Sequence, residues 1–337
     1  MTIRGKKYLY LTVGVGISVV LLWTLFRNIN FSKLWLALEN ANYWWLLPNI
    51  ALTVFTMYQR AFRWKYMVPP GSNPPYKNLV AATCVGFMAN NVLPLRLGEF
   101  VRAYSLSTQV KKISKSAALA NIFVERMVFD LFALLLIFGG TLWFSSTIRG
   151  KLDDEMITAI YSTIGIALLG LITVLILAFK PASVGNRITR YLFFLPDTLK
   201  AKIRDIIMRF AQGLEFMSNF STLMNVVVQT LLIWLLMGIS GYFVFLAFGF
   251  HLPLDAPFVL LVVVSISILI PSSPGFVGVY HAGAVWTLMA YGISKEDALS
   301  CAIVMHAVQF IVVTLLGFYF LKKEHLSLRE LEEGAVD

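Results

Sequence analysis

The sequence predicts an all-α integral membrane protein with six full transmembrane helices and two re-entrant half-helix hairpins, arranged as two halves of inverted topology. Of its 337 residues, 58% are hydrophobic and 14% are charged, whereas soluble domains are near half apolar and a quarter charged. Six apolar runs reach the length of about 20 residues that a helix needs to cross a bilayer. Two shorter apolar runs are broken by proline and glycine, as re-entrant segments are.

The six predicted spans are residues 8–26, 43–62, 117–144, 156–179, 223–250 and 298–321. The first follows a basic stretch, Arg4 to Lys7, and so resembles a signal peptide. Its apolar run is long for a signal peptide and lacks an A-x-A-like cleavage site, so we interpret it as a retained membrane helix.

The two broken segments are 79–106, interrupted at Pro94, and 258–291, interrupted at Pro271. Each break has the spacing Pro-x-x-x-Gly. Three predicted membrane crossings separate the two broken segments. An odd number of crossings inverts the second half (145–323) relative to the first half (8–144) within a single membrane domain, 1–337. Interrupted helices at matching positions of inverted halves indicate the midplane site of a transporter.

Basic residues set the predicted orientation. If the amino terminus is cytoplasmic, 22 of the 28 Lys and Arg residues fall on the cytoplasmic side, five fall outside, and Arg126 lies within a span. The cytoplasmic segments are 1–7, 60–78, 95–116, 180–222 and 322–337. This bias predicts a multi-pass cell-membrane protein with both termini cytoplasmic. The net charge of +10 is then a topology signal, and no nucleic-acid partner is expected.

The segment 180–222 is basic, with apolar residues at helical spacing. This pattern fits a helix lying on the anionic inner leaflet and fits a cytoplasmic connector equally well. Residues 324–337 form a short acidic tail.

Charged residues within apolar segments are the main functional candidates, because burying a charge in a membrane is costly. Two interpretations are open: the arginines bind a phosphate-bearing headgroup, for which their fork is suited, or the charges neutralise one another and lock two helices together. Arg126 and Asp130 are four apart and can pair along a helix. The candidate headgroup residues are Asn90, Asn91, Arg96, Glu99, Arg102, Glu125, Arg126 and Asp130.

The second half carries far less charge. Its candidate residues, in the hairpin and the last span, are Pro271, Ser272, Ser273, Gly275, Gly278, Tyr280, His281, His306 and Gln309. The glycines permit close backbone approach, His281 could titrate near neutral pH, and His306 with Gln309 suits an interhelical hydrogen bond. We expect no cofactor and no metal site.

The first-half residues resemble a known family. The string from Asn90 to Arg102 fits the pattern N-x-x-x-P-x-R-x-G-E-x-x-R of the membrane, flippase-like domain of lysylphosphatidylglycerol synthases and its stand-alone relatives. The Glu125-Arg126-x-x-x-Asp130 motif and the Pro-Gly-x-x-Gly-Val run at 274–279 look like the next two landmarks of that family. The match covers nearly the whole chain in the right order.

The resemblance implies a polytopic domain that moves aminoacylated phospholipid between leaflets in full-length synthases, in which a separate soluble domain makes that lipid. No aminoacyl-transferase domain is recognisable, so we expect that this chain alone is not the synthase. Many family members carry glutamate where this sequence has His281. If that glutamate couples movement of the lipid to protons in those members, the coupling carboxylate is absent from this position here.

Three functions are therefore considered. The first is translocation of an anionic phospholipid or polyprenyl-phosphate-linked lipid, which makes membrane lipids the expected partners. The second is a non-transporting scaffold or accessory subunit of a lipid- or glycan-modifying enzyme. The third, an intramembrane hydrolase or transferase, is the weakest because no G-x-S-x-G nucleophile elbow is present. We therefore expect a protein that is not an enzyme.

Overall fold

The computed structural model describes residues 3–69, 71–93, 97–144, 196–201 and 215–324, with isolated positions between 150 and 172 and between 327 and 331. Within these residues the regular structure is entirely helical. The elements are α1 (Ile3–Phe26), α2 (Phe31–Glu39), η1 (Tyr43–Trp45), α3 (Leu46–Met67), α4 (Tyr76–Val92), α5 (Gly98–Gln109), α6 (Lys115–Val124), the π-helical turn η3 (Glu125–Asp130), α7 (Leu131–Phe144), η4 (Glu215–Ser218), α12 (Phe220–Ala247), α13 (Ala256–Ser267), η5 (Pro274–Phe276), α14 (Val279–Ala290) and α15 (Lys295–Lys323).

Side-chain caps fix several helix starts. Asn30, Ser114, Asn219 and Ser294 each accept a hydrogen bond from the backbone N–H three residues on, at the starts of α2, α6, α12 and α15. Such caps satisfy amide groups that a helix leaves without partners.

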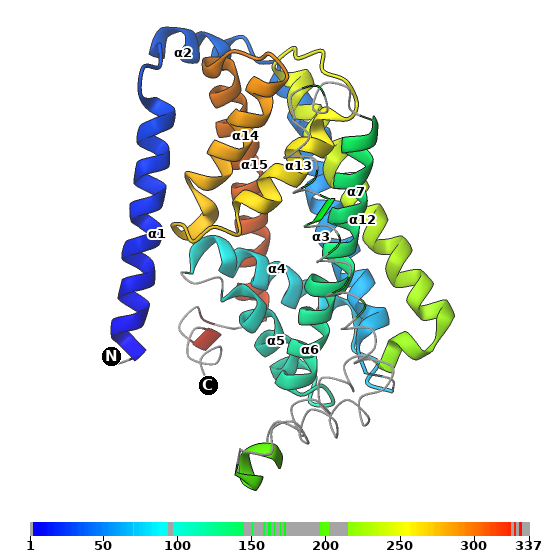
Figure 1. Cartoon of the computed structure of the whole chain (residues 1–337). Coiled ribbons are helices and arrows are strands. Elements are labelled where there is room, and N and C mark those ends of the chain that lie inside the picture. Colours follow the sequence, from blue (N-terminus) through cyan, green and yellow to red (C-terminus); the bar gives the residue numbers. More distant parts are fainter. Residues whose placement is uncertain are drawn as a thin grey trace.

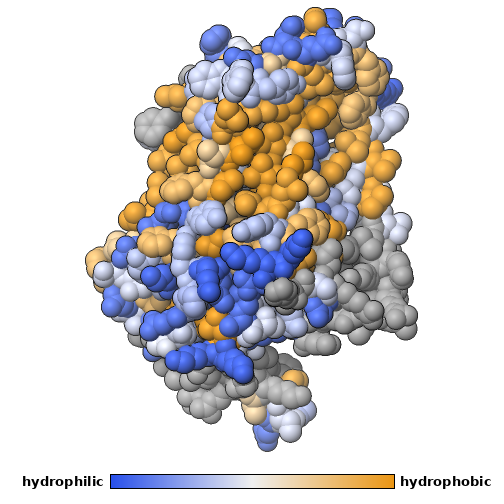
Figure 2. All heavy atoms as spheres, turned by 180° about the vertical axis from the view of Figure 1, so that it is seen from behind, coloured by the Kyte–Doolittle hydropathy of each residue, from blue (hydrophilic) through white to orange (hydrophobic). Residues whose placement is uncertain are grey.

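On the face shown in Figure 2, an apolar belt lies between two more polar ends. Among the described residues, α12 and α15 are each long and apolar enough to cross a bilayer, and residues 12–26 of α1 pass the same test together with α2, to which they are bent by 90°. The helices and the belt agree with an integral membrane protein. The count of six spans remains a prediction, and the span at 156–179 lies almost entirely outside the described residues.

Helix α3 departs from the predicted pattern. The apolar run was expected to end at residue 62 and to lead into a cytoplasmic segment, but the helix continues to Met67. Arg60 and Arg63, counted above among the cytoplasmic charges, are 5% and 0% exposed. Arg102, also counted there, is 2% exposed. Removing these three from the 22 leaves the bias toward the predicted cytoplasmic side intact.

Two helical hairpins enter the bundle from opposite ends and meet near its middle (Figure 1). The first is formed by α4 and α5, and the second by α13 and α14. Their breaks touch, since η5 packs against α4 and a Cβ on Gly275 would lie 3.4 Å from the carbonyl oxygen of Asn91. In the second break, Gly275 and Gly278 have positive φ angles of 71° and 92°, a backbone conformation that favours glycine.

Small residues let the two arms of each hairpin approach closely. A Cβ on Gly86 of α4 would lie 2.6 Å from the Cβ of Arg102 and 2.8 Å from the carbonyl oxygen of Gly98 in α5. In the second hairpin, a Cβ on Gly283 would lie 2.5 Å from the hydroxyl of Ser267. Asn90 also bridges the first break by accepting a hydrogen bond of 2.8 Å from the backbone N–H of Gly98.

The basic segment 180–222 falls largely outside the described residues. Of its described part, the side chains of Phe216 and Met217 in η4 are buried in the core that α3, α4 and α5 share with α12.

We expect Gly98→Ala to destabilise the protein, because its Cβ would overlap the carbonyl oxygen of Gly86 and the side chain of Asn90. Overpacking of this kind costs about 1–3 kcal/mol, so the apparent melting temperature of the detergent-purified protein should fall. Gly16→Ala in α1 is the matched control, because nothing lies within 4 Å of its Cβ. Equal melting temperatures for the two variants would contradict close hairpin packing at Gly98.

Candidate functional site

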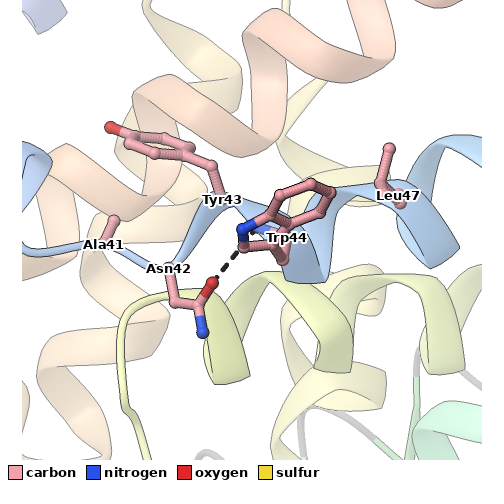
Figure 3. Close-up of a pocket in the computed structure, with 5 residues that line it drawn as sticks. All are labelled: Ala41, Asn42, Tyr43, Trp44 and Leu47. Atoms are coloured by element: carbon pink, nitrogen blue, oxygen red, sulfur yellow. Dashed lines mark hydrogen bonds between the residues drawn. The ribbon is translucent and has the colours of Figure 1, made fainter.

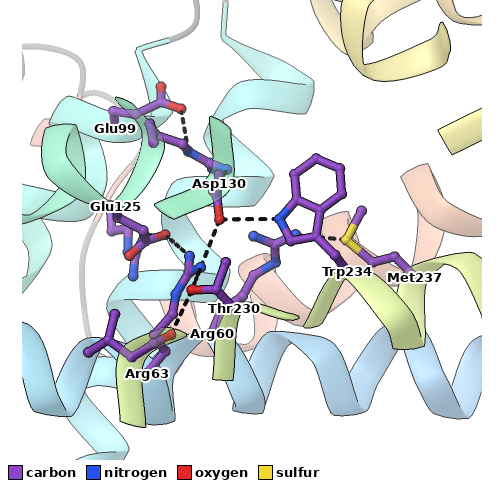
Figure 4. A network of polar contacts seen from close by, with 11 residues as sticks. Arg60, Arg63, Glu99, Glu125, Asp130, Thr230, Trp234 and Met237 are labelled. Atoms are coloured by element: carbon purple, nitrogen blue, oxygen red, sulfur yellow. Dashed lines mark hydrogen bonds and ion pairs between the residues drawn. The ribbon is translucent and has the colours of Figure 1, made fainter. Parts of the chain in front are cut away.

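Arg63 lies at the centre of a buried charge network that joins four parts of the chain (Figure 4). From α3, its guanidinium donates to Asp130 at 2.7 Å and to the hydroxyl of Thr230 in α12 at 2.8 Å. It also pairs with Glu125 at 2.9 Å. Because the side chain of Arg63 is fully buried, both of these ion pairs lie in the protein interior.

A π-helical turn places Glu125 and Asp130 on the same arginine. The two residues are five apart, and five residues of α-helix turn the chain by about 500°, which leaves the side chains about 140° apart. The segment Glu125–Asp130 is wound instead as a π-helix, whose turn is wider. The turn therefore lets both carboxylates reach Arg63. Such turns are rare in helices and often mark functional sites.

Arg102 joins α5 to the same network. Its guanidinium pairs with Glu125 at 2.9 Å and lies 4.0 Å from the ring centre of Trp64. Glu125 is therefore shared by Arg63 and Arg102, both almost completely buried. This half of the network fixes α3, α5 and the π-helical turn together, as the structural interpretation of the sequence expected.

The other edge of the network is partly open. Arg126 pairs with Asp130 at 3.0 Å, which confirms the predicted pair along the helix. Its contact with Glu99 is longer, at 3.8 Å, and these two side chains are 27% and 32% exposed. Asn90 donates to Glu99 at 3.4 Å. The loosest and most accessible charges therefore lie beside the break of the first hairpin.

Arg60 is the member of the network that sequence reasoning missed most clearly. One turn before Arg63, its guanidinium lies 4.9 Å from the ring centre of Phe87 and donates to the sulfur of Met237 at 3.0 Å, a weak acceptor. No described carboxylate lies within ion-pair distance. Arg60 and Arg63, three apart beside Trp64 at the end of an apolar run, were the signal that could have identified both.

Among the predicted first-half residues, Glu99, Arg102, Glu125, Arg126, Asp130 and Asn90 come together in this network. Asn91 points elsewhere, donating to the hydroxyl of Thr314 in α15 at 3.0 Å. Arg96 lies outside the described residues. The network also includes Thr230 and Trp234 of α12, whose indole N–H donates to Asp130 at 3.4 Å.

In the second half, aromatic and imidazole rings pack together behind the break. Tyr280 stacks on His306 with ring centres 4.5 Å apart, and His281 meets His306 edge to face at 4.8 Å. The Nε2 atom of His306 is 2.8 Å from the carbonyl oxygen of Gly275, and the backbone N–H of Gly278 donates to Nδ1 of His281 at 3.4 Å. These contacts hold the irregular backbone of the second break.

His306 makes the expected hydrogen bond to another element, because its Nε2 atom lies 2.8 Å from the Gly275 carbonyl oxygen in η5. Gln309, in contrast, is exposed. Pro271 is also exposed.

The break is held from outside by α1. The hydroxyl of Ser18 accepts from the backbone N–H of Ser273 at 2.9 Å and donates to the carbonyl of Val277 at 2.8 Å. A Cβ on Gly14 would lie 2.7 Å from the carbonyl oxygen of Ser272. Among the described residues, neither serine hydroxyl of the break is hydrogen bonded to a histidine.

A shallow pocket at the start of α3 is lined by Ala41, Asn42, Tyr43, Trp44 and Leu47 (Figure 3). It has no charged lining residue and lies more than three helical turns from Arg60. Trp44 is 78% exposed and Tyr43 46%, as expected for aromatic residues at a membrane interface.

These observations define a class: a helical membrane protein with two broken hairpins and a buried arginine–carboxylate network beside one break. A family model described as the lysylphosphatidylglycerol synthase TM region matches residues 11–317. The chain belongs to this family, which confirms the resemblance seen in the sequence.

Several relatives are archaeal. The UPF0104 membrane protein MJ1078 of Methanocaldococcus jannaschii is 25% identical over 71% of this chain and 96% of its own length. A UPF0104 membrane protein of Methanothermobacter thermautotrophicus is 25% identical over 90% of this chain and 91% of its own length. Glycosyltransferase AglD of Haloferax volcanii is 26% identical over 77% of this chain, but the match covers only 45% of AglD. No solved structure matches.

We expect Arg63→Gln to destabilise the protein much more than Arg126→Gln. Removing one partner of a buried ion pair costs about 3–5 kcal/mol, because the remaining charges stay buried, and Arg63 serves two carboxylates. Arg126 is partly exposed, so water can replace its contacts in part. Thermal unfolding of the purified full-length variants measures the difference. Equal melting temperatures would show that Arg63 is not the centre of the network.

Proposed function

We propose that the protein moves an anionic phospholipid or a polyprenyl-phosphate-linked lipid between the two leaflets of the cell membrane. The observation that carries the proposal is the partly exposed edge formed by Arg126 and Glu99 beside the first hairpin break. An arginine held by a long contact of 3.8 Å can exchange its carboxylate for the phosphate of a ligand, and arginine binds phosphate in bidentate geometry.

The cost of the network supports a functional role. Buried ion pairs seldom stabilise a protein more than apolar residues of similar volume would. Four arginines and three carboxylates among the described residues therefore need a benefit other than stability. A headgroup pathway through an apolar bundle is such a benefit, because ionisable residues inside membranes typically mark transport pathways.

In the proposed architecture, six spans and two re-entrant hairpins form two inverted halves, and helix packing supports this. Inverted halves would make α3 equivalent to α12, α4 to α13, α5 to α14, and the α6–α7 helix to α15. Each helix contact in the first half should then have an equivalent in the second. The contacts α3–α4, α4–α5, α5–α6 and α4–α15 correspond to α12–α13, α13–α14, α14–α15 and α13–α7, all of which are present. The meeting point of the hairpin breaks is then the midplane region where transporters bind substrate.

The proposed orientation places both termini in the cytoplasm, following the lysine and arginine bias. Helix α1 begins and α15 ends at the same end of the bundle (Figure 1). The open edge at Arg126 and Glu99 would then be reached from the cytoplasmic side, because the α4–α5 hairpin enters from that end.

The accessory role remains a second candidate, and the AglD relative favours it. That protein is named a glycosyltransferase, and the match leaves more than half of AglD uncovered. In this alternative the chain would present a polyprenyl-phosphate lipid to a glycan-modifying enzyme without moving it. The second-half serines support neither a hydrolase nor a transferase, since Ser273 donates to a backbone carbonyl and not to a histidine.

We expect Arg126→Gln to abolish lipid movement while leaving the fold intact. The full-length protein would be reconstituted into vesicles that contain phosphatidylglycerol with a fluorescent acyl chain, and dithionite would bleach the label in the outer leaflet. Wild-type protein should expose label from both leaflets, whereas the variant should slow this at least ten-fold. Arg27→Gln, which removes an exposed arginine lying over Trp23, is the matched control and should behave as wild type.

Movement at the full wild-type rate by Arg126→Gln would remove Arg126 from the mechanism. No movement of any labelled lipid by the wild-type protein, combined with selective retention of an anionic lipid on purification, would favour the accessory role. Mass spectrometry of the retained lipids provides that second readout.

A further inference from the structure

Arg60 is a buried cation with no direct ion-pair partner among the described residues. Its side chain comes from α3, and the residue is 5% exposed. Within the part of the chain that the structure describes, two of its three guanidinium nitrogens, Nε and Nη1, have no hydrogen-bond partner. The third donates only to the sulfur of Met237. The charges of Asp130 and Glu125 act on Arg60, but both carboxylates are paired with other arginines. The described network thus sets four arginines against three carboxylates, and because buried charge is costly unless it is balanced, one bound anion would balance it.

The position of Arg60 shows where that anion would sit. The guanidinium carbon of Arg60 lies 4.9 Å from the ring centre of Phe87, and that of Arg126 lies 5.1 Å from the same ring. Phe87 belongs to α4, one turn before Asn90, and is half-buried. Arg60 and Arg126 therefore both lie against the same aromatic ring, Arg60 buried and Arg126 partly exposed.

We propose that Arg60, Phe87 and Arg126 form the binding site for the phosphate of a phosphodiester lipid, and that the lipid neutralises the charge of Arg60. This inference rests on the proposed function, and it names the substrate class of that site. The phosphate first meets Arg126, which releases Glu99, and then occupies the unpaired donors of Arg60.

One unpaired positive charge fits one negative charge. A phosphodiester, as in phosphatidylglycerol or in a sugar joined through phosphate to a polyprenol, carries a single negative charge. A phosphomonoester carries about −1.5 to −2 at neutral pH, and its excess charge would lie near Asp130 and Glu99, which are already negative. The site therefore favours the diester over the monoester with the same lipid tails.

The apolar surroundings favour a lipid over free phosphate. Arg60 and Phe87 lie on helices that pack against α12 and α15, two helices of the described residues that are each long and apolar enough to cross a bilayer. Inorganic phosphate would lose its hydration there without bringing an apolar tail that gains from burial.

The test is lipid-dependent thermal stabilisation of the full-length protein in detergent, with dioleoyl phosphatidylglycerol as the probe. Without lipid, Arg60→Met should melt at or above the wild-type temperature, because the variant no longer buries an unpaired charge. The affinity of Arg60→Met for phosphatidylglycerol should be at least ten-fold lower than that of the wild-type protein. Arg60→Lys, which keeps the charge but loses the fork, should fall between the two. Arg27→Met is the matched control and should bind as wild type.

Four further probes identify the ligand chemistry. A polyprenyl-phosphate monosaccharide should stabilise the wild-type protein as phosphatidylglycerol does, or better, if it is the natural lipid. Dioleoyl phosphatidic acid should bind several-fold more weakly. Dioleoyl phosphatidylcholine, a diester whose quaternary ammonium offsets the phosphate charge, should also bind more weakly than phosphatidylglycerol, and inorganic phosphate should not stabilise at all. If phosphatidic acid stabilises the protein as much as phosphatidylglycerol does, the preference for a diester is wrong. If inorganic phosphate does so, the inference that the ligand is a lipid is wrong.

The proposal is overturned if Arg60→Met binds phosphatidylglycerol with wild-type affinity, or if it melts well below wild type or fails to fold without lipid, because Arg60 would then be structural. Its failure is distinguishable from failure of the transport function. If Arg126→Gln loses transport while Arg60→Met binds lipid as wild type does, the transport function is supported and the Arg60 site is not. If lipid binding depends on Arg60 but the wild-type protein moves no lipid, the Arg60 site is supported and the protein has the accessory role.

Discussion

The fold depends on one buried interaction, the guanidinium of Arg63 held between Glu125 and Asp130. It ties α3 to the π-helical turn and, through Thr230, to α12. A buried charge is tolerated only when its partners are in place, so these elements must assemble together. The remaining charges are arranged around this pair, from the enclosed Arg102 to the partly open Arg126.

Close backbone packing and electrostatics act on the same helices. Gly86 and Gly98 bring α4 against α5, and this approach places Arg102 within reach of Glu125 and Asn90 within reach of Glu99. On the opposite side, Ser18 of α1 holds the second break through backbone groups alone. The first hairpin is therefore fixed by charge and the second by neutral contacts, so a charged ligand would act mainly on the first.

The sequence was sufficient to predict the helical membrane class, the two broken segments and most of the charge cluster, because apolar length and buried charge are local signals. It was not sufficient for Arg60 and Arg63. Both follow an apolar run and look like charges at a membrane boundary, and only the continued helix shows that they turn inward. The partner of His306 was also missed, because Gly275 lies 31 residues earlier and a backbone carbonyl leaves no mark in the sequence. The contact of α4 with η5 is equally non-local.

The π-helical turn shows what this segment tolerates in chain length. Its wider turn holds one residue more than an α-helical turn, so deleting one residue between Glu125 and Asp130 would leave the two carboxylates four apart, a spacing that α-helical winding also places on one face. The helix after the deletion would then keep nearly the same orientation relative to α6. A deletion within the α-helical part of α7 would instead rotate everything after it by about 100°, so the π-helical turn is the place where this helix can lose a residue without losing its buried network.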